Sequence, residues 1–297
     1  MKRLSFMIVL TAVLLSLGSC NRQDRKLLRY SVSDTSYRIE NATLMDFVWK
    51  DGAIQQVNFN NPYLFDRPDY EDYSSVFNYN LEYAYSDSVL CALKGNKYYS
   101  KLNFVQRKLE SIDQYSQDGV HAYHVTFTPE DSYTMKVVYY SMSNEAMKWL
   151  ESNLYPRKDS AGAKVHYEMP EDTSLHVFAE ATYQWKDGNL VYAKASFVEG
   201  FSVESNMEYD NKVNPFHNIY CKFDRVDFLA SALHWADNTL GVSKNNLTKV
   251  SVRFQQDGEG ELKMENTFEN SYEYDGDYPV LQKSTKNATV FRYEYVK

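Results

Sequence analysis

The segment from Ala181 to Asn211 limits the fold of this chain more than any other part of the sequence. Aromatic and polar residues alternate through Tyr183-Gln184-Trp185 and again through Leu190-Val191-Tyr192. Between these runs lies Asp187-Gly188, a dipeptide that favours the tight turn of a two-stranded hairpin. The segment therefore predicts a β-hairpin, and the alternation continues as far as Met207-Glu208-Tyr209-Asp210.

The same motifs recur in an order that indicates an internal repeat. Trp49-Lys50-Asp51-Gly52 corresponds to Trp185-Lys186-Asp187-Gly188, and Asn80-Leu81-Glu82-Tyr83 corresponds to Asn206-Met207-Glu208-Tyr209. The first pair is 136 residues apart and the second 126, which places about ten extra residues in the first half. Two matches in the same order predict a duplication.

Composition favours strands over helices or disorder. The chain has 26 Tyr and 16 Phe but only 11 Gly and 7 Pro, which is typical of strands with aromatic faces. We therefore predict an all-β, mainly antiparallel fold. Strands are expected over residues 44–49, 54–59, 77–85, 89–93, 98–109, 121–128, 133–141, 165–168, 175–185, 247–254, 262–268, 271–274, 280–283 and 289–296.

One or two short helices interrupt this pattern. Ser143 or Asn144 can cap a helix over 145–150, which Pro156 would stop. A second helix is expected after Asp224, with the apolar residues Val226, Leu229, Ala230 and Leu233 on one face.

The N-terminus predicts export. Lys2 and Arg3, a short apolar run and small residues up to Ser19 form a secretory signal peptide. Leu17-Gly18-Ser19-Cys20 resembles the lipobox of bacterial lipoproteins, in which the cleaved chain begins at the lipid-bearing cysteine. The alternative is an ordinary secretory signal in which Cys20 is incidental. We expect Cys20 to be the lipid attachment site, on the outer membrane of the cell envelope, with the periplasmic or surface face undetermined.

The predicted organisation is a signal peptide over 1–19, a lipidated tether over 20–37, an N-terminal β half over 38–155 and a C-terminal β half over 163–297. Removal of the signal leaves 30 basic and 40 acidic residues, a net charge of −10. This charge argues against a nucleic-acid partner, because phosphate binding needs a basic surface. Cys91 and Cys221 remain, either as buried thiols or as a disulfide that an oxidising compartment permits.

No residue stands out as catalytic, and the sequence predicts no cofactor. His121 and His124 are three apart in an expected strand, which would point them to opposite faces. His166 and His176, near several carboxylates, form a possible metal site, but exposed structural histidines are commoner. The acidic loop 66–72 could bind calcium, although a solvated loop is the simpler interpretation. The sequence contains neither Gly-x-Ser-x-Gly nor His-Glu-x-x-His, and no phosphate-binding glycine loop.

The C-terminal 120 residues resemble a known family. The resemblance is carried by residues 185–190, Met207-Glu208-Tyr209-Asp210, Asn214-Pro215-Phe216, residues 243–250, Tyr272-Glu273-Tyr274-Asp275 and Tyr278-Pro279. These runs resemble an uncharacterised family of Gram-negative lipoproteins that is distantly similar to the YD repeats of RHS proteins. The resemblance implies an extended, strongly curved antiparallel sheet of hairpin repeats, and it implies no enzymatic activity.

The sequence does not name an activity. The leading hypothesis is a membrane-tethered, non-enzymatic binding or structural lipoprotein of the cell envelope, whose partner is an envelope protein or a glycan. The alternatives are a glycan-active enzyme with paired carboxylates and a carrier of a lipophilic molecule. An enzyme requires a cleft with a raised carboxyl pKa, a carrier requires an enclosed apolar cavity, and a scaffold requires an exposed aromatic patch.

Overall fold

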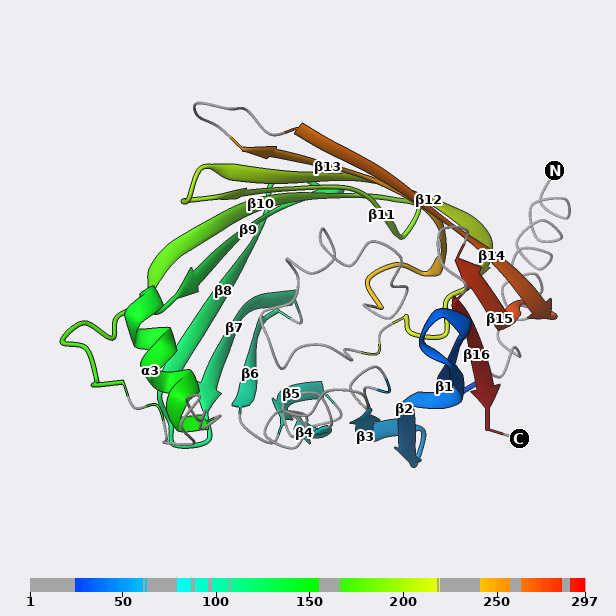
Figure 1. Cartoon of the computed structure of the whole chain (residues 1–297), viewed down its shortest axis with the longest axis horizontal. Helices are drawn as coiled ribbons and strands as arrows, with labels where there is room; N and C mark the ends of the chain where they lie inside the picture. The colour runs from blue at the N-terminus through cyan, green and yellow to red at the C-terminus, as the bar shows by residue number, and fades with distance from the viewer. Residues whose placement is uncertain are drawn as a thin grey trace, which may run out of the picture.

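The computed structural model describes residues 25–60, 62, 79–86, 89–95, 98–106, 108–154, 165, 167–217, 219, 241–256, 263–284 and 289–296. Within these residues, sixteen strands form one antiparallel sheet (Figure 1). They are β1 (Leu27–Asp34), β2 (Ile39–Lys50), β3 (Ala53–Phe59), β4 (Tyr79–Ser86), β5 (Val89–Lys94), β6 (Tyr98–Val105), β7 (Lys108–Ser116), β8 (His121–Pro129), β9 (Thr134–Ser141), β10 (His176–Lys186), β11 (Asn189–Phe197), β12 (Phe201–Val213), β13 (Asn245–Gln256), β14 (Lys263–Asp275), β15 (Tyr278–Ser284) and β16 (Thr289–Tyr295).

The sheet closes on itself as a barrel. Each strand pairs with its neighbours in sequence, and β1 pairs with both β2 and β16. Side chains reinforce this seam, because Arg29 of β1 contacts Asp46 of β2 at 2.8 Å and Glu294 of β16 at 3.8 Å. Thr289 also donates a hydrogen bond to the buried carboxylate of Asp34 at 3.0 Å. The predicted all-β, curved antiparallel sheet of hairpins is confirmed, and the closure of that sheet is an additional finding.

The two Asp-Gly hairpins have the same local structure. Asp51 and Gly52 have φ values of 50° and 87°, and Asp187 and Gly188 have 53° and 81°, as a type I′ turn requires. In both hairpins the register shifts next to the tryptophan, so that Trp49 pairs with Ile54 and Trp185 with Leu190. The two motif-bearing hairpins therefore share their turn type and register, while the duplication of the two halves stays a prediction.

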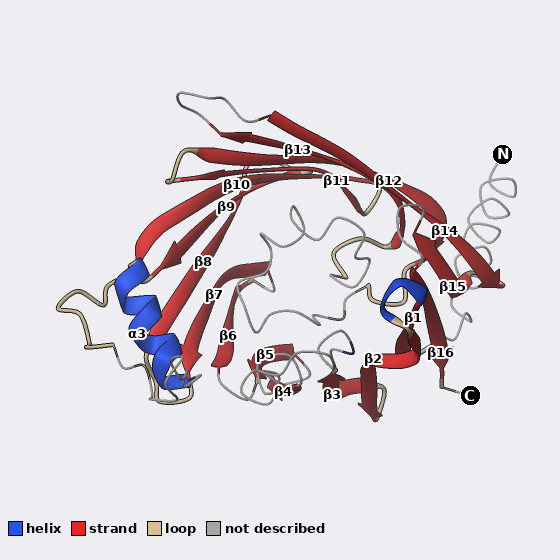
Figure 2. Cartoon of the chain, in the orientation of Figure 1, coloured by secondary structure: helices blue, strands red, loops and turns tan. Residues whose placement is uncertain are grey.

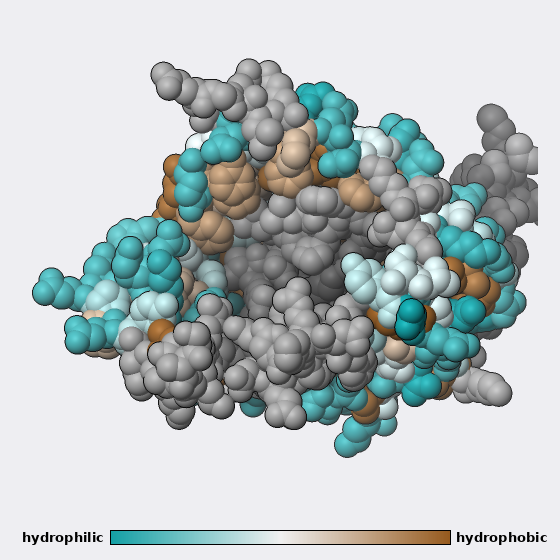
Figure 3. All heavy atoms as spheres, viewed as in Figure 1, coloured by the Kyte–Doolittle hydropathy of each residue, from teal (hydrophilic) through white to brown (hydrophobic). Residues whose placement is uncertain are grey.

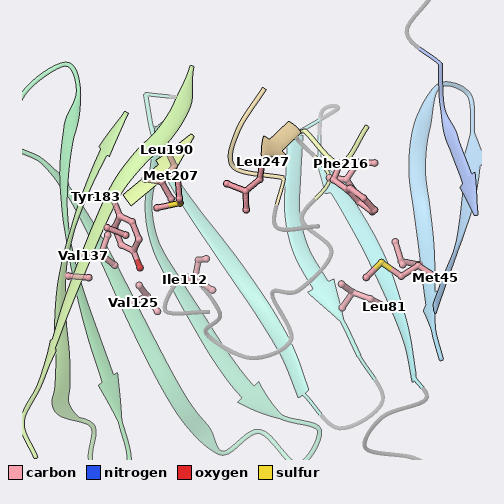
Figure 4. Packing of buried hydrophobic residues seen from close by; sticks show 14 of the residues in the cluster. Met45, Leu81, Ile112, Val125, Val137, Tyr183, Leu190, Met207, Phe216 and Leu247 are labelled. Atoms are coloured by element: carbon pink, nitrogen blue, oxygen red, sulfur yellow. The ribbon is translucent and has the colours of Figure 1, made fainter. Parts of the chain in front are cut away.

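Side chains alternate between an apolar inner wall and a polar outer wall. In β4, Leu81 and Tyr83 are buried whereas Asn80 and Glu82 are exposed, as the period of two predicts. The same alternation occurs in β10, where Ala179 and Ala181 are buried and Glu180 is exposed, and the buried apolar residues of most strands form one cluster. Figure 4 shows this packing, with Val137, Tyr183 and Ile112 among the residues on the inner side.

Phe216 fills part of the interior from the turn that follows β12. Its ring lies 5.2 Å from that of Tyr30 on β1 and 6.0 Å from that of Phe47 on β2. Asn214 holds this turn, because its side-chain oxygen accepts from the amide of Phe216 at 3.0 Å and its side-chain nitrogen donates to the carbonyl of Ser243 at 2.9 Å. The turn after β12 thus packs against β1 and β2 in the interior.

Helix α3 (Asn144–Leu154) lies beside the strand wall (Figure 2). The hydroxyl of Ser143 accepts from the amide of Ala146 at 3.2 Å, so Ser143 is the predicted cap. The buried face of the helix, which includes Ala146 and Leu150, packs with Tyr98 of β6 and Ala122 of β8. A short 3-10 turn, η1 (Thr35–Tyr37), follows β1. No helix of the described chain is long and apolar enough to cross a bilayer.

The structure corrects three strand predictions. The single strand expected over 98–109 is a hairpin, β6 and the start of β7, because Gln106 turns the chain with φ at 50°. The strands expected over 262–268 and 271–274 are one strand, β14. The strand expected over 165–168 is absent from the described residues there, 165 and 167–170.

Several other predictions concern residues outside the described part of the chain. These are the signal peptide, Cys20, Cys221, the acidic loop 66–72, the second helix after Asp224 and Pro156. The segment expected as a tether over 20–37 includes β1, which belongs to the barrel. Strands from both predicted halves, 38–155 and 163–297, lie in the same closed sheet.

Candidate functional site

The outer wall carries ion pairs between neighbouring strands. Lys136 of β9 contacts Glu180 of β10 at 2.7 Å, and Lys283 of β15 contacts Glu273 of β14 at 2.9 Å. The outer surface that can be seen in Figure 3 is correspondingly hydrophilic around much of its rim. Ion pairs of this kind lose less free energy in water than in hydrocarbon, where each charge would be costly to bury.

One region of the outer wall, on β6 to β9, differs from the regions that carry ion pairs. Imidazole and aromatic groups lie together there. The tyrosine rings of Tyr99 and Tyr115 stack with centroids 5.3 Å apart, and the imidazole of His121 stacks on Tyr115 at 4.6 Å. The imidazole of His124 lies 5.5 Å from the ring of Tyr140. We call Asp113, His121 and His124, which lie among these rings, the β7–β8 cluster.

A β-bulge places both histidines on the same face. Gln114 pairs with Tyr123 and Tyr115 pairs with His121, so Ala122 is an extra residue in β8. The prediction that His121 and His124 point to opposite faces is therefore wrong. It assumed regular alternation, and the extra residue in β8 removes that alternation between positions 121 and 124.

Both imidazoles converge on one carboxylate oxygen. Nδ1 of His124 lies 2.7 Å from Oδ1 of Asp113, and Nε2 of His121 lies 3.0 Å from the same atom. The other oxygen, Oδ2, accepts a hydrogen bond from the side-chain amide of Asn103 at 2.8 Å. The amide of Asn103 also donates to Ser111 at 2.9 Å, so two strands, β6 and β7, fix the orientation of the carboxylate.

The contact of His121 with Asp113 is not a satisfied hydrogen bond. Nε2 of His121 is shielded from solvent and makes no hydrogen bond to any residue that the structure describes. The pKa of the neighbouring Tyr115 is raised, first by burial of its phenol and then by the negative charges of Asp113 and of Tyr99 in its ionised form. Imidazole nitrogen and carboxylate oxygen are the donors that divalent transition metals bind, and the three donor atoms lie within 4.8 Å of one another.

The other predicted histidine site is simpler. His176 lies 3.0 Å from the carboxylate of Asp172 and 3.2 Å from the hydroxyl of Ser174, and both members of the ion pair are mostly exposed. Hydrogen bonds from Ser174 and then from His176 lower the pKa of Asp172 to about 2. His166 lies outside the described residues, so the structure shows one imidazole here rather than two.

A shallow groove of about 480 Å³ lies on the outer wall of β9, β10 and β11. Its lining includes Lys136, Glu180, Lys194 and Ser196 together with the apolar Val177 and Phe197. A groove with this many charged and polar groups differs from the enclosed apolar cavity that a carrier of lipophilic molecules requires.

Comparison with known proteins yields neither a family nor a curated relative. No family model matches the chain, and no curated protein matches it. Among solved structures, the chain is similar to a porin-like protein from Bacteroides vulgatus at 11% identity, with 92% of this chain and 99% of that chain covered and a TM-score of 0.43. A porin-like protein from Bacteroides uniformis is similar at 10% identity, with 91% and 96% covered and a TM-score of 0.45.

Proposed function

We propose that this chain is a non-enzymatic binding protein of the cell envelope, held by a lipid on Cys20, with its barrel in the aqueous compartment and its ligand at the β7–β8 cluster. The observation that carries the proposal is the convergence of His121 and His124 on Asp113 in a wall that otherwise carries cross-strand ion pairs.

The division between the two walls supports the aqueous location. Buried apolar side chains from strands β1 to β4, β6 to β13 and β16 form one cluster on the inner wall. Charged side chains on the outer wall form ion pairs between β1 and β2, between β9 and β10, and between β14 and β15. A lipid attached ahead of β1 would tether such a barrel to a membrane without placing its wall among the acyl chains.

Asp131 and Asp172 do not meet one requirement of a glycosidase. A glycosidase needs one carboxyl group whose pKa is raised so that it can donate a proton at neutral pH. Hydrogen bonds from backbone and side-chain donors instead lower the pKa of Asp131 and of Asp172, so both of these groups are ionised at neutral pH. The carboxylate of Asp113 accepts hydrogen bonds from Asn103 and His124.

The experiment is purification of the lipid-anchored chain from its own envelope, with mass spectrometry of the proteins and small molecules that remain bound. We compare the wild type with His124→Gln and with a control elsewhere on the outer wall, Arg253→Gln on β13, whose guanidinium lies 3.8 Å from Glu265. We expect a stoichiometric bound species that survives Arg253→Gln and is lost with His124→Gln. A bound species that both variants retain would overturn the assignment of the ligand to this cluster.

A further inference from the structure

We propose that Asp113, His121 and His124 bind a divalent transition-metal ion, for which Zn²⁺ is the natural probe. This inference rests on the proposed binding role of the same cluster and names the chemical class of its ligand. Two imidazoles and one carboxylate form a donor set that favours zinc, copper or nickel over calcium and magnesium, which prefer oxygen donors.

The distances suit such an ion after a small adjustment. Zinc lies about 2.0–2.2 Å from nitrogen and carboxylate ligands, which in a tetrahedral site separates the donor atoms by roughly 3.4 Å. Here Oδ1 of Asp113 is 2.7 Å from Nδ1 of His124 and 3.0 Å from Nε2 of His121. An ion would therefore need these donor pairs to move apart by about 0.7 Å and about 0.4 Å, which rotation of the partly exposed side chains allows.

The second observation is the unsatisfied nitrogen of His121. Its Nε2 is shielded from solvent and has no hydrogen-bond partner among the described residues, although it faces Asp113. A metal ion between the imidazole and the carboxylate would occupy that nitrogen and Oδ1 together. Stacking of His121 on Tyr115 at 4.6 Å already holds the imidazole in this direction.

Residues around the three donors could also orient them and leave access for an ion. Ligating carboxylates are oriented by hydrogen bonds to their second oxygen, and Oδ2 of Asp113 accepts such a bond from Asn103 at 2.8 Å. The side chains of His121 and His124 are 36% and 28% exposed, so an ion can enter from solvent. Three protein ligands leave a fourth position open for water or for a donor atom of an exchangeable ligand.

The test uses the lipid-anchored chain, purified in detergent with a tag that contains no histidine and stripped of metal with a chelator. Zn²⁺ binding is measured by titration calorimetry and by elemental analysis after dialysis, with Mg²⁺ as the control ion. We compare the wild type with His121→Gln, His124→Gln and Asn103→Leu. The matched control is His176→Gln, which removes an outer-wall histidine that is also paired with an aspartate.

We expect one Zn²⁺ per wild-type chain and no binding of Mg²⁺. Replacing either ligand histidine should weaken zinc binding by more than about tenfold. Asn103→Leu, which removes only a supporting hydrogen bond, should weaken it by about tenfold. His176→Gln should bind zinc as the wild type does, and circular dichroism should show that all metal-free variants are folded. Absence of stoichiometric zinc binding, or zinc binding that survives both His121→Gln and His124→Gln, would overturn the inference.

The two proposals fail in different ways. Zinc binding is measured on the purified chain and does not depend on membrane location or on an envelope ligand. If the wild type binds no zinc but still retains an envelope species that His124→Gln loses, the binding role remains and the metal is excluded. If zinc binds but no such species exists, the cluster is a metal site without the wider role.

Discussion

The inner and outer walls of the barrel are built from the same strands but carry different kinds of side chain. Inside, apolar side chains pack together and neutral groups pair with each other, as in the 2.8 Å contact between the hydroxyls of Tyr139 and Tyr183. Outside, charged groups pair across neighbouring strands, as Lys136 does with Glu180. We infer that packing in the inner wall determines stability and that the outer wall can carry binding groups.

The largest effect is expected from loss of packing in the inner wall. Leu81 of β4 is fully buried, so Leu81→Ala should lower the free energy of unfolding by about 2–5 kcal/mol. The outer-wall control is Val48→Ala in β2, where the valine is 45% exposed and the change should stay within about 0.5 kcal/mol. Denaturant unfolding of both variants gives the comparison. Equal losses would contradict the division between the walls.

A smaller effect is expected from the neutral hydrogen bond of the inner wall. Tyr139→Phe and Tyr183→Phe each remove one partner of a buried hydroxyl pair, which should cost about 1 kcal/mol per variant. The double variant should lose less than the sum, because both substitutions remove the same bond. A double-mutant cycle on unfolding free energies measures this coupling, and strictly additive losses would show that the two hydroxyls act independently.

The smallest effect is expected from an ion pair of the outer wall. Lys136→Gln breaks the contact with Glu180, and both side chains lie largely in solvent. Exposed ion pairs contribute little because water and salt screen them. The unfolding midpoint of this variant should equal that of the wild type within error, at both low and high salt. A midpoint that drops as far as that of Leu81→Ala would show that outer-wall charges hold the barrel together.

The alternation of the walls could be predicted from the sequence, whereas the functional cluster could not. Leu81 and Tyr83 alternate with Asn80 and Glu82 in an unbroken period of two, and a local pattern of this kind survives folding. The cluster depends on the β-bulge at Ala122 of β8. This bulge brings His121 and His124 to the same face of the sheet. Nothing in the residue types around Ala122 signals a bulge, since it needs no glycine.

Two further features depend on information that local patterns do not hold. The hairpin turn between β6 and β7 uses Gln106 at a positive φ, and an amide side chain there gives a much weaker signal than Asp-Gly. Closure of the barrel pairs β1 with β16. Thr289 and Asp34, which are 255 residues apart, form a hydrogen bond between these two strands. The seam is a property of the whole sheet rather than of either strand.

Whether the barrel stays with the membrane only through the lipid on Cys20 can be measured directly. Residues 1–20 are replaced by the cleavable leader of a soluble exported protein, which removes Cys20 while keeping export. The envelope is then fractionated in parallel with that of cells expressing the wild type. We predict that the wild type stays with the membranes and that the exchanged chain is folded in the aqueous fraction. An exported, folded chain that still needs detergent for release would contradict a water-facing outer wall and a lipid tether.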